Sequence, residues 1–194
     1  MTPLEAAKLA DQCYTDNPTI GEKCSASRAV IYGNAIAFPG TDNVACFLAD
    51  LDAVAFDCPD FGRVHTGFHD AWEKIADQVL KNPVEIVIGH SLGAAIALFC
   101  AASLCRIGKP PKQVFAFEPP RVSCDDSLRK IFEAYPVELH LFRNGLDVVP
   151  LVPRLLEDWV HPGDLNFIGK PIVPFPNIED HLMKNVIASL QSMK

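Results

Sequence analysis

The sequence predicts an α/β fold in which helices cover both faces of a central, mostly parallel β-sheet. Short strand-like segments alternate with helix-like segments along the 194 residues. Val84–Ile88 is rich in β-branched residues and is bounded by Pro83 and Gly89, as is typical of a buried strand. A Gly-x-Ser-x-Gly pentapeptide follows it and leads into an Ala-rich helix. Because no repeat or linker divides the chain, we expect residues 1–194 to form one domain.

The first half of the chain predicts a helix, a hairpin and two further helices. Thr2 as N-cap and Glu5 closing a capping box predict a helix over the first eleven residues. Ala29–Tyr32 and Ala35–Phe38 flank Gly33-Asn34, as in a β-hairpin. Apolar residues then recur with helical spacing in two segments, Val44, Phe47, Leu48 and Leu51, and Phe68, Trp72, Ile75 and Val79.

The second half continues the alternation of strands and helices. Leu92–Ile107 is rich in Ala and Leu and stops at Gly108, which predicts a helix. The segment from Asp147 to Pro176 is rich in proline and is expected to be largely loop, with a hairpin through Leu165–Val173. The remaining elements are strands at Val114–Phe117 and Val137–Phe142, a helix at Asp125–Ala134, and a last helix carrying Ile178, Leu182, Val186 and Leu190.

Composition limits the classes of partner. Hydrophobic residues make up 49% of the chain and charged residues 21%, which is the balance of a globular, water-soluble protein. The net charge of −7 argues against nucleic acid and anionic headgroups as partners. No apolar run approaches the roughly 20 residues that cross a membrane.

The cysteines and the first residues bear on the compartment. There are seven cysteines, an odd number without a Cys-x-x-Cys pair, so neither a full disulfide framework nor a zinc knuckle is indicated. Residues 1–11 lack the basic start and apolar stretch of a signal peptide. We therefore expect mostly reduced thiols and a cytoplasmic protein.

Gly89-His90-Ser91-Leu92-Gly93 is the central chemical signal. A nucleophile elbow requires a buried strand before the serine and a helix after it, and both are expected here. The positive end of that helix also favours an oxyanion. This context predicts the α/β-hydrolase fold with Ser91 as nucleophile. The alternative is a serine that merely caps the helix after an ordinary turn.

A nucleophilic serine needs a histidine base and an orienting carboxylate, in the chain order Ser, acid, His. His181 lies where a loop gives way to the last helix, and it is the preferred base. His140 lies inside a strand, where packing explains it. His161 lies in a Pro-Gly loop, where it is expected to stabilise a turn. Asp147 directly follows a strand and is the preferred acid. Glu118, which also ends a strand after the nucleophile, is the alternative.

Several blocks in the right order resemble the class 3, or fungal-type, lipase family over roughly Ile36 to Val186. The blocks are Phe38-Pro39-Gly40-Thr41, Val64-His65-Thr66-Gly67-Phe68, the Gly-His-Ser-Leu-Gly elbow, Pro120-Arg121-Val122, and the segments Asp147-Val148-Val149-Pro150 and Asp180-His181. The resemblance implies a triad of Ser91, Asp147 and His181. It also implies an oxyanion hole from the backbone N–H groups of Thr41 and Leu92.

Residues 43–51 fall where the family carries its lid, so Val44, Phe47 and Leu48 are candidate substrate contacts; a helix packed on the core is the alternative. His65 and His69 are spaced like a metal pair, but Gly67 between them and the block match favour a structural role. No metal and no cofactor are expected.

The sequence also departs from the family pattern. Pro39 stands where arginine is usual, and Glu118 and Ser123 stand where glycines are common. A carboxylate near the site is expected to disfavour anionic substrates. The chain is shorter than is usual for the family and lacks its secretion signal.

The expected function is that of a serine esterase or lipase acting on small-molecule or lipid esters, with transient contact to a lipid interface. Two alternatives remain open from the sequence. One is a phospholipase or acyltransferase using the same triad, and the other is a non-catalytic binding module with a hydrolase-like fold.

Overall fold

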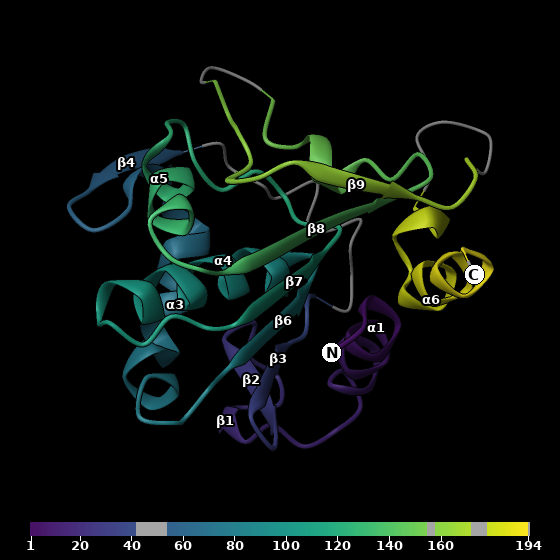
Figure 1. The fold of residues 1–194 in the computed structure, drawn as a ribbon, viewed down its shortest axis with the longest axis horizontal. Helices are drawn as coiled ribbons and strands as arrows, with labels where there is room; N and C mark the ends of the chain where they lie inside the picture. Colours follow the sequence, from purple (N-terminus) through teal and green to yellow (C-terminus); the bar gives the residue numbers. More distant parts are fainter. Residues whose placement is uncertain (42–53, 155–157, 172–177, 194) are drawn as a thin grey trace.

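A seven-stranded sheet lies at the centre of the computed structural model, in the order β1-β2-β3-β6-β7-β8-β9 (Figure 1). The first three strands are antiparallel, and each pairing from β3 onward is parallel. This confirms the expected, mostly parallel sheet. The strands are β1 (Ile20–Gly21), β2 (Arg28–Tyr32), β3 (Ala35–Phe38), β6 (Ile86–His90), β7 (Gln113–Phe117), β8 (Glu138–Asn144) and β9 (Leu165–Ile168).

The structure describes residues 1–41, 54–154, 158–171 and 178–193. The expected helix at 43–51, with Val44, Phe47 and Leu48, lies outside these residues. The predicted hairpin of β2 and β3 is present, with Tyr32 paired to Ala35. A second hairpin, β4 (Ala55–Cys58) and β5 (Gly62–His65), was not predicted.

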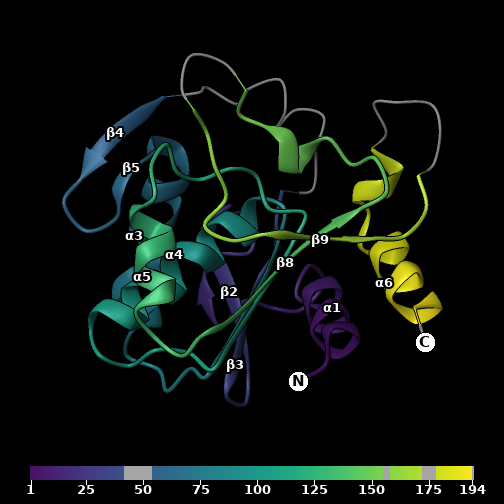
Figure 2. The same ribbon diagram turned by 45° about the horizontal axis from the view of Figure 1, so that its top comes forward.

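Helices cover both faces of the sheet. Figures 1 and 2 place α1 and α6 on one side of it and α3, α4 and α5 on the other. The helices are α1 (Pro3–Gln12), α3 (Thr66–Val79), α4 (Leu92–Arg106), α5 (Ser127–Glu133) and α6 (Met183–Ser192), with short 3-10 turns η1 (Val149–Leu151) and η2 (Glu179–His181). The Thr2–Glu5 capping box is present at the start of α1.

Side chains that alternate along each central strand fill two apolar layers. On β7, Val114 and Ala116 belong to the cluster under α3, α4 and α5, whereas Phe115 and Phe117 belong to the cluster under α1 and α6. This is the period-2 pattern of a strand buried on both faces. An apolar layer therefore packs on each face of the sheet, and the larger one lies under α3, α4 and α5.

Three sequence expectations differ from the structure at element ends. The nucleophile strand was placed at Val84–Ile88, but β6 extends to His90 because its last residues still pair with β7. Residues 165–168 form β9, which pairs in parallel with β8 instead of folding back as a hairpin; residues 172–173 of that hairpin lie outside the described part. The last helix begins at Met183, so Ile178 and Leu182 precede it and are exposed.

The close approach of β6 and α4 depends on two glycines. A Cβ on Gly93 would overlap the carbonyl oxygen of Phe38, and one on Gly89 would overlap the carbonyl oxygen of Gly93. All residues of α4 from Leu92 to Cys105 are buried, so the helix cannot move outward without uncovering apolar surface. The glycines of the elbow motif are therefore required for packing as well as for the turn.

We predict that Gly93→Ala destabilises the fold by at least about 1–3 kcal/mol, the usual range for an overpacked core. Gly67→Ala is the matched control, because a Cβ there meets only a side-chain atom of His65 at 3.5 Å. Urea unfolding followed by circular dichroism measures both free energies of unfolding. Equal midpoints for the two variants would contradict the predicted overlap.

Candidate active site

The register of the parallel strands brings distant residues to one edge of the sheet. Phe38 pairs with Gly89, His90 with Phe117, and Phe117 with Phe142. The segments after these strands therefore emerge side by side, at the carboxyl edge where α/β folds form their sites. These segments carry Thr41, Ser91, Glu118 and Asp147, four residues that the sequence singled out.

Ser91 lies on a strained turn between β6 and α4. Its φ of 57° and ψ of −127° are unfavourable for a residue with a side chain, and such strain is concentrated at functional sites. Its backbone N–H donates to Phe117 O at 3.0 Å, which holds the turn against β7. The hydroxyl makes no capping bond to α4. The helix-cap alternative therefore has no hydrogen bond to support it.

Asp147 and His181 form a buried pair. His181 Nδ1 lies 2.7 Å from Asp147 Oδ2, and both side chains are 0% exposed. Because an ionised carboxylate only accepts hydrogen bonds, Nδ1 carries the proton, and the lone pair of a neutral His181 lies on Nε2. The structure thus brings together the two residues that the sequence preferred, and the imidazole contacts Asp147 instead of Glu118 through this nitrogen.

Two buried polar atoms of the site are available to bond to each other or to a substrate. Ser91 Oγ and His181 Nε2 are buried and have no hydrogen-bond partner among the described residues. His90, the neighbour of Ser91, lies against His181 with ring centroids 4.6 Å apart, which places the elbow beside the imidazole. An unpaired hydroxyl and an unpaired imidazole nitrogen are the groups that nucleophilic catalysis requires.

Asp147 remains ionised although it is buried. Burial alone disfavours its charge, but hydrogen bonds from His181, from the Glu118 side chain and from Val149 N–H lower its pKa below the ordinary value. Arg143 Nε adds a bond of 3.0 Å to the Asp147 carbonyl oxygen. A charged Asp147 stabilises the imidazolium that forms when His181 takes up a proton.

The proposed oxyanion donors lie next to the elbow. Leu92 is the first residue of α4, where a backbone N–H has no partner within the helix. Gly40 lies against the serine, since a Cβ there would be 2.8 Å from Ser91 Cβ. Thr41, the next residue, lines a pocket of about 230 Å³ together with His90 and His181. The structure thus places both predicted segments at the nucleophile.

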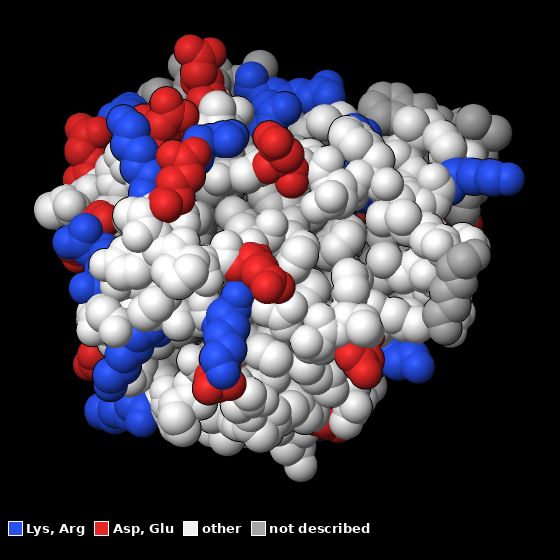
Figure 3. Space-filling model, in the orientation of Figure 1, with Lys and Arg blue, Asp and Glu red and all other residues white. Residues whose placement is uncertain are grey.

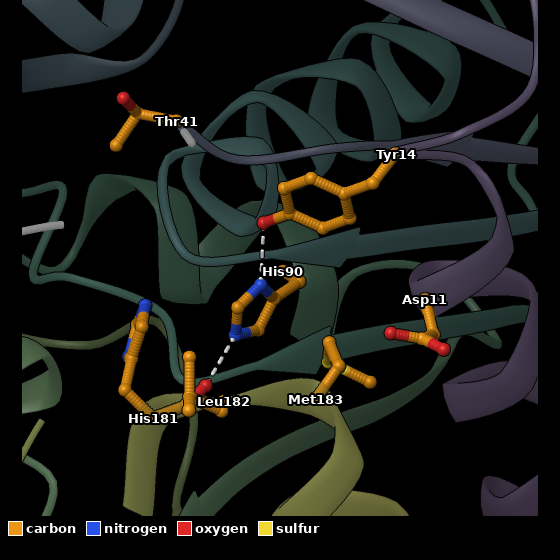
Figure 4. A pocket seen from close by; sticks show the side chains of 7 residues that line it. All are labelled: Asp11, Tyr14, Thr41, His90, His181, Leu182 and Met183. Carbon is orange, nitrogen blue, oxygen red and sulfur yellow. Dashed lines mark hydrogen bonds between the residues drawn. The ribbon is translucent and has the colours of Figure 1, made fainter. Parts of the chain in front are cut away.

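A hydrogen-bond chain that the sequence did not predict connects these segments (Figure 4). Gly40 N–H donates to Tyr14 Oη at 2.8 Å. Figure 4 draws the next two bonds, in which Tyr14 Oη–H donates to His90 Nδ1 at 2.6 Å and His90 Nε2–H donates to His181 O at 2.9 Å. Burial, and then the neighbouring His181, lower the pKa of His90 to about 3, so it stays neutral as the chain requires. Tyr14 lies 76 residues from His90, and no sequence spacing signals their contact.

The loop carrying His181 is fixed by a second unpredicted residue, Asn144. Its Nδ2 donates to Asp180 O at 2.9 Å, and its Oδ1 accepts from Ser189 Oγ at 2.7 Å. Leu146 N–H donates to the Asp180 carboxylate at 2.8 Å. These bonds join the end of β8 to η2 and α6, so His181 is held on both sides.

The other histidines have structural surroundings. His140 stacks on Phe115 with centroids 4.9 Å apart, in agreement with its expected packing role. His161 Nε2–H donates to Pro150 O at 2.9 Å. His65 Nδ1 accepts from Phe68 N–H at the start of α3. Among the described residues, the one group of three or more side chains spaced to hold a metal ion is Glu118, Asp147 and His181, and neither His65 nor His69 belongs to it.

The surface of one face carries charges of both signs. In Figure 3 the charged side chains gather mostly over the side with α3, α5 and β4, and acidic and basic groups are interspersed there. Within the described residues, no helix is both long enough and apolar enough to span a membrane.

Comparisons with known proteins agree with this site. A family model described as lipase (class 3) matches residues 35–157. The secreted mono- and diacylglycerol lipase A of Penicillium cyclopium is 30% identical over 149 residues, which cover 70% of this chain and 48% of that protein. A secreted mono- and diacylglycerol lipase of Malassezia globosa is 28% identical over 203 residues, covering 84% and 66%. This chain thus spans about half the length of the Penicillium relative and about two thirds of the other.

A solved structure shows the fold independently. The triacylglyceride lipase of Rhizomucor miehei superimposes with a TM-score of 0.70 at 20% identity, over 93% of this chain and 91% of that one. This likeness confirms the predicted α/β-hydrolase fold. His181 lies beyond the residues matched by the family model, so it is supported by the sequence expectation and by its 2.7 Å contact with Asp147.

The expected cytoplasmic location is wrong. Relatives from Penicillium, Malassezia and Fusarium are named secreted lipases, which contradicts that expectation. The cysteines misled because their redox state was used to infer the compartment. Cys13 and Cys100 are buried, and burial raises the pKa of both thiols, that of Cys13 to about 12. Such thiols serve as small apolar core side chains in any compartment.

We predict that Tyr14→Phe lowers the free energy of unfolding by about 1–3 kcal/mol, because Gly40 N–H and His90 Nδ1 both lose a buried partner. Tyr32→Phe is the matched control, since its hydroxyl donates to Asp16 at 2.8 Å away from the site. Urea unfolding and the rate of ester hydrolysis are measured for both. If the two variants behave alike in both measurements, the Tyr14 chain does not support the site.

We also predict a loss of stability between pH 6.5 and pH 4 that His161→Gln reduces. Burial, and then nearby Arg121, lower the pKa of His161 to about 4. Between pH 6.5 and pH 4 the unfolded chain therefore binds a proton that the folded chain does not. The free energy of unfolding decreases as the pH is lowered, by up to about 1.4 kcal/mol per pH unit. Gln keeps the donor to Pro150 O but does not titrate.

Denaturant midpoints at pH 7, 5.5 and 4 test this prediction. His140→Gln, at a half-exposed position, controls for the general effect of removing an imidazole. A wild type and a His161→Gln variant that lose the same stability between pH 7 and pH 4 would refute the assigned protonation state.

Proposed function

This chain belongs to the class 3 lipase family, and from that membership and the geometry of its site we propose that it is a serine hydrolase of carboxylic esters. The proposed triad is Ser91 as nucleophile, His181 as base and Asp147 as orienting acid. The observation that carries the proposal is the buried 2.7 Å contact of His181 Nδ1 with Asp147, next to a serine on a strained elbow.

The first step is proton transfer and attack. His181 Nε2 accepts the Ser91 proton while Oγ forms a bond to the carbonyl carbon of the ester. The carbonyl π electrons move to oxygen, which gives a tetrahedral oxyanion. The backbone N–H groups of Thr41 and Leu92 are proposed to donate to that oxygen, and the positive end of α4 favours its charge.

The second step releases the two products. The intermediate collapses, the bond to the alcohol oxygen breaks, and the His181 imidazolium protonates the leaving alcohol. Water then attacks the acyl-enzyme as His181 accepts its proton. The second tetrahedral intermediate collapses, its bond to Ser91 Oγ breaks, and the His181 imidazolium returns the proton to Oγ as the carboxylic acid leaves, so no cofactor is consumed.

Acylglycerols are the substrate class that we propose. Two relatives are named for mono- and diacylglycerols, and the Rhizomucor enzyme is named for triacylglycerides. These esters carry no charge. An uncharged substrate suits a protein with a net charge of −7 and an ionised Asp147 within its active site, because neither repels it.

We predict that Ser91→Ala lowers kcat on p-nitrophenyl esters and on mono- and diacylglycerols by about three or more powers of ten. The matched control is Ser103→Ala on the same helix, whose buried hydroxyl donates only to Phe99 O; it should keep its activity. Equal turnover by wild type and Ser91→Ala would exclude Ser91 as nucleophile. If the wild type hydrolysed none of these esters, an acyltransferase or a non-catalytic binding function would be favoured instead.

A further inference from the structure

Glu118 is a buried acid without a part in the steps above. It directly follows β7, is 0% exposed, and has a φ of 51°. This left-handed conformation is unfavourable for a residue with a Cβ. The fold thus bears both a strained backbone and a desolvated carboxyl group here. Interactions of the Glu118 side chain must offset both of these costs.

The partners of Glu118 lie in the site itself. Glu118 Oε1 accepts from Asn144 N–H at 2.7 Å. Its carboxyl group lies beside that of Asp147, since the ligand atoms of Glu118, Asp147 and His181 all lie within 4.8 Å of one another. Oε2 receives no N–H or O–H from any described residue. Glu118 therefore extends the row of imidazole and carboxylate by one more carboxyl group.

One proton must lie between the two carboxyl groups. Two carboxylates this close and shielded from water cannot both be ionised. Asp147 already accepts from His181 Nδ1 and from Val149 N–H, and both bonds favour its charged form. Burial, and then Asp147, raise the pKa of Glu118 well above its ordinary range. The proton therefore resides on Glu118.

We propose that Glu118 is a positioning residue whose protonated Oε2 donates a hydrogen bond to the Asp147 carboxylate and holds it in line with His181 Nδ1. The proposal rests on the proposed function, because it takes Asp147 and His181 as acid and base. Glu118 touches neither the substrate nor the reacting atoms and acts only through Asp147. Its proton stays in place throughout the reaction.

This arrangement makes the site sensitive to alkaline pH. When Glu118 loses its proton, Asp147 loses a donor and gains a negative neighbour, so the two side chains repel each other. Stability that depends on the protonated form is present at acidic pH and is lost as the pH rises through the pKa of folded Glu118. The charged or titratable groups around Glu118 and Asp147 are Arg143 on β8, His181 on η2 and His90 on β6.

The test compares the full chain with Glu118→Gln, Glu118→Leu and Glu118→Gly, measuring kcat and KM for a soluble p-nitrophenyl ester across pH. Leu removes the donor, and kcat should fall about tenfold to a hundredfold with KM nearly constant. Gln keeps an N–H donor and an acceptor for Asn144, so it should restore most of kcat and abolish the alkaline loss that Glu118 causes. Gly also removes the donor but relieves the backbone strain.

Glu118→Gly separates the effect of the strained backbone from the effect of the carboxyl group. It should have a low kcat, like Glu118→Leu, while being more stable than Glu118→Leu in urea unfolding. It also keeps the test decisive if the leucine variant does not fold. The His181 Nδ1 proton resonance in NMR gives a readout independent of turnover: it should lie far downfield in wild type and Glu118→Gln and move upfield in Glu118→Gly.

Two results would overturn the proposal. One is a wild-type kcat and pH profile in Glu118→Gly, and the other is an unchanged alkaline loss in Glu118→Gln. Failure of the proposed function is a different result, because wild type and Ser91→Ala would then hydrolyse esters equally. The NMR shift would still report whether Glu118 donates to Asp147.

Discussion

The tight turn between β6 and α4 is the constraint on which the rest of the site depends. Ser91 adopts a strained conformation there, at a cost of roughly 1–3 kcal/mol. The strain persists because α4 is buried along nearly its whole length and each large apolar side chain contributes about 1.5–3 kcal/mol when buried. Packing therefore outweighs the strain, and the turn presents the hydroxyl without letting it cap the helix. Gly89 and Gly93 make this possible, because a Cβ on either would separate strand and helix.

A parallel sheet supplies the second requirement, which is convergence. Strands aligned in one direction end at one edge, so segments far apart in sequence meet there. Polar bonds then lock the segments together: Tyr14 joins α1 to the end of β3 and to His90, and Asn144 joins β8 to η2. Buried polar groups are costly unless they are paired. The site is therefore rigid around Ser91 and His181, whose functional atoms are left unpaired among the described residues.

The buried pair of Glu118 and Asp147 carries one negative charge between its two carboxyl groups. Burial keeps His90 neutral, and Asp147 and burial together keep Glu118 protonated, whereas the donors around Asp147 keep it ionised. Two carboxyl groups of similar chemistry thus take opposite protonation states because their donors differ. A single carboxylate facing an imidazole is the arrangement that stabilises a transient imidazolium without a second charge to compete.

The sequence by itself determined the class of fold, and it predicted Ser91 as nucleophile, with the acid and then the base after it in the chain. Hydrophobic periodicity and the elbow motif are local patterns, so they can be recognised in the sequence without knowing which distant residues are in contact. It did not determine the ends of β6 and β9, the hairpin of β4 and β5, or the partners Tyr14 and Asn144. It favoured Asp147 over Glu118 as the acid, although each follows a strand. Only the tertiary structure shows that His181 Nδ1 contacts Asp147, because the surroundings of each carboxyl group depend on which donors lie within a few ångströms, and those donors come from elsewhere in the chain.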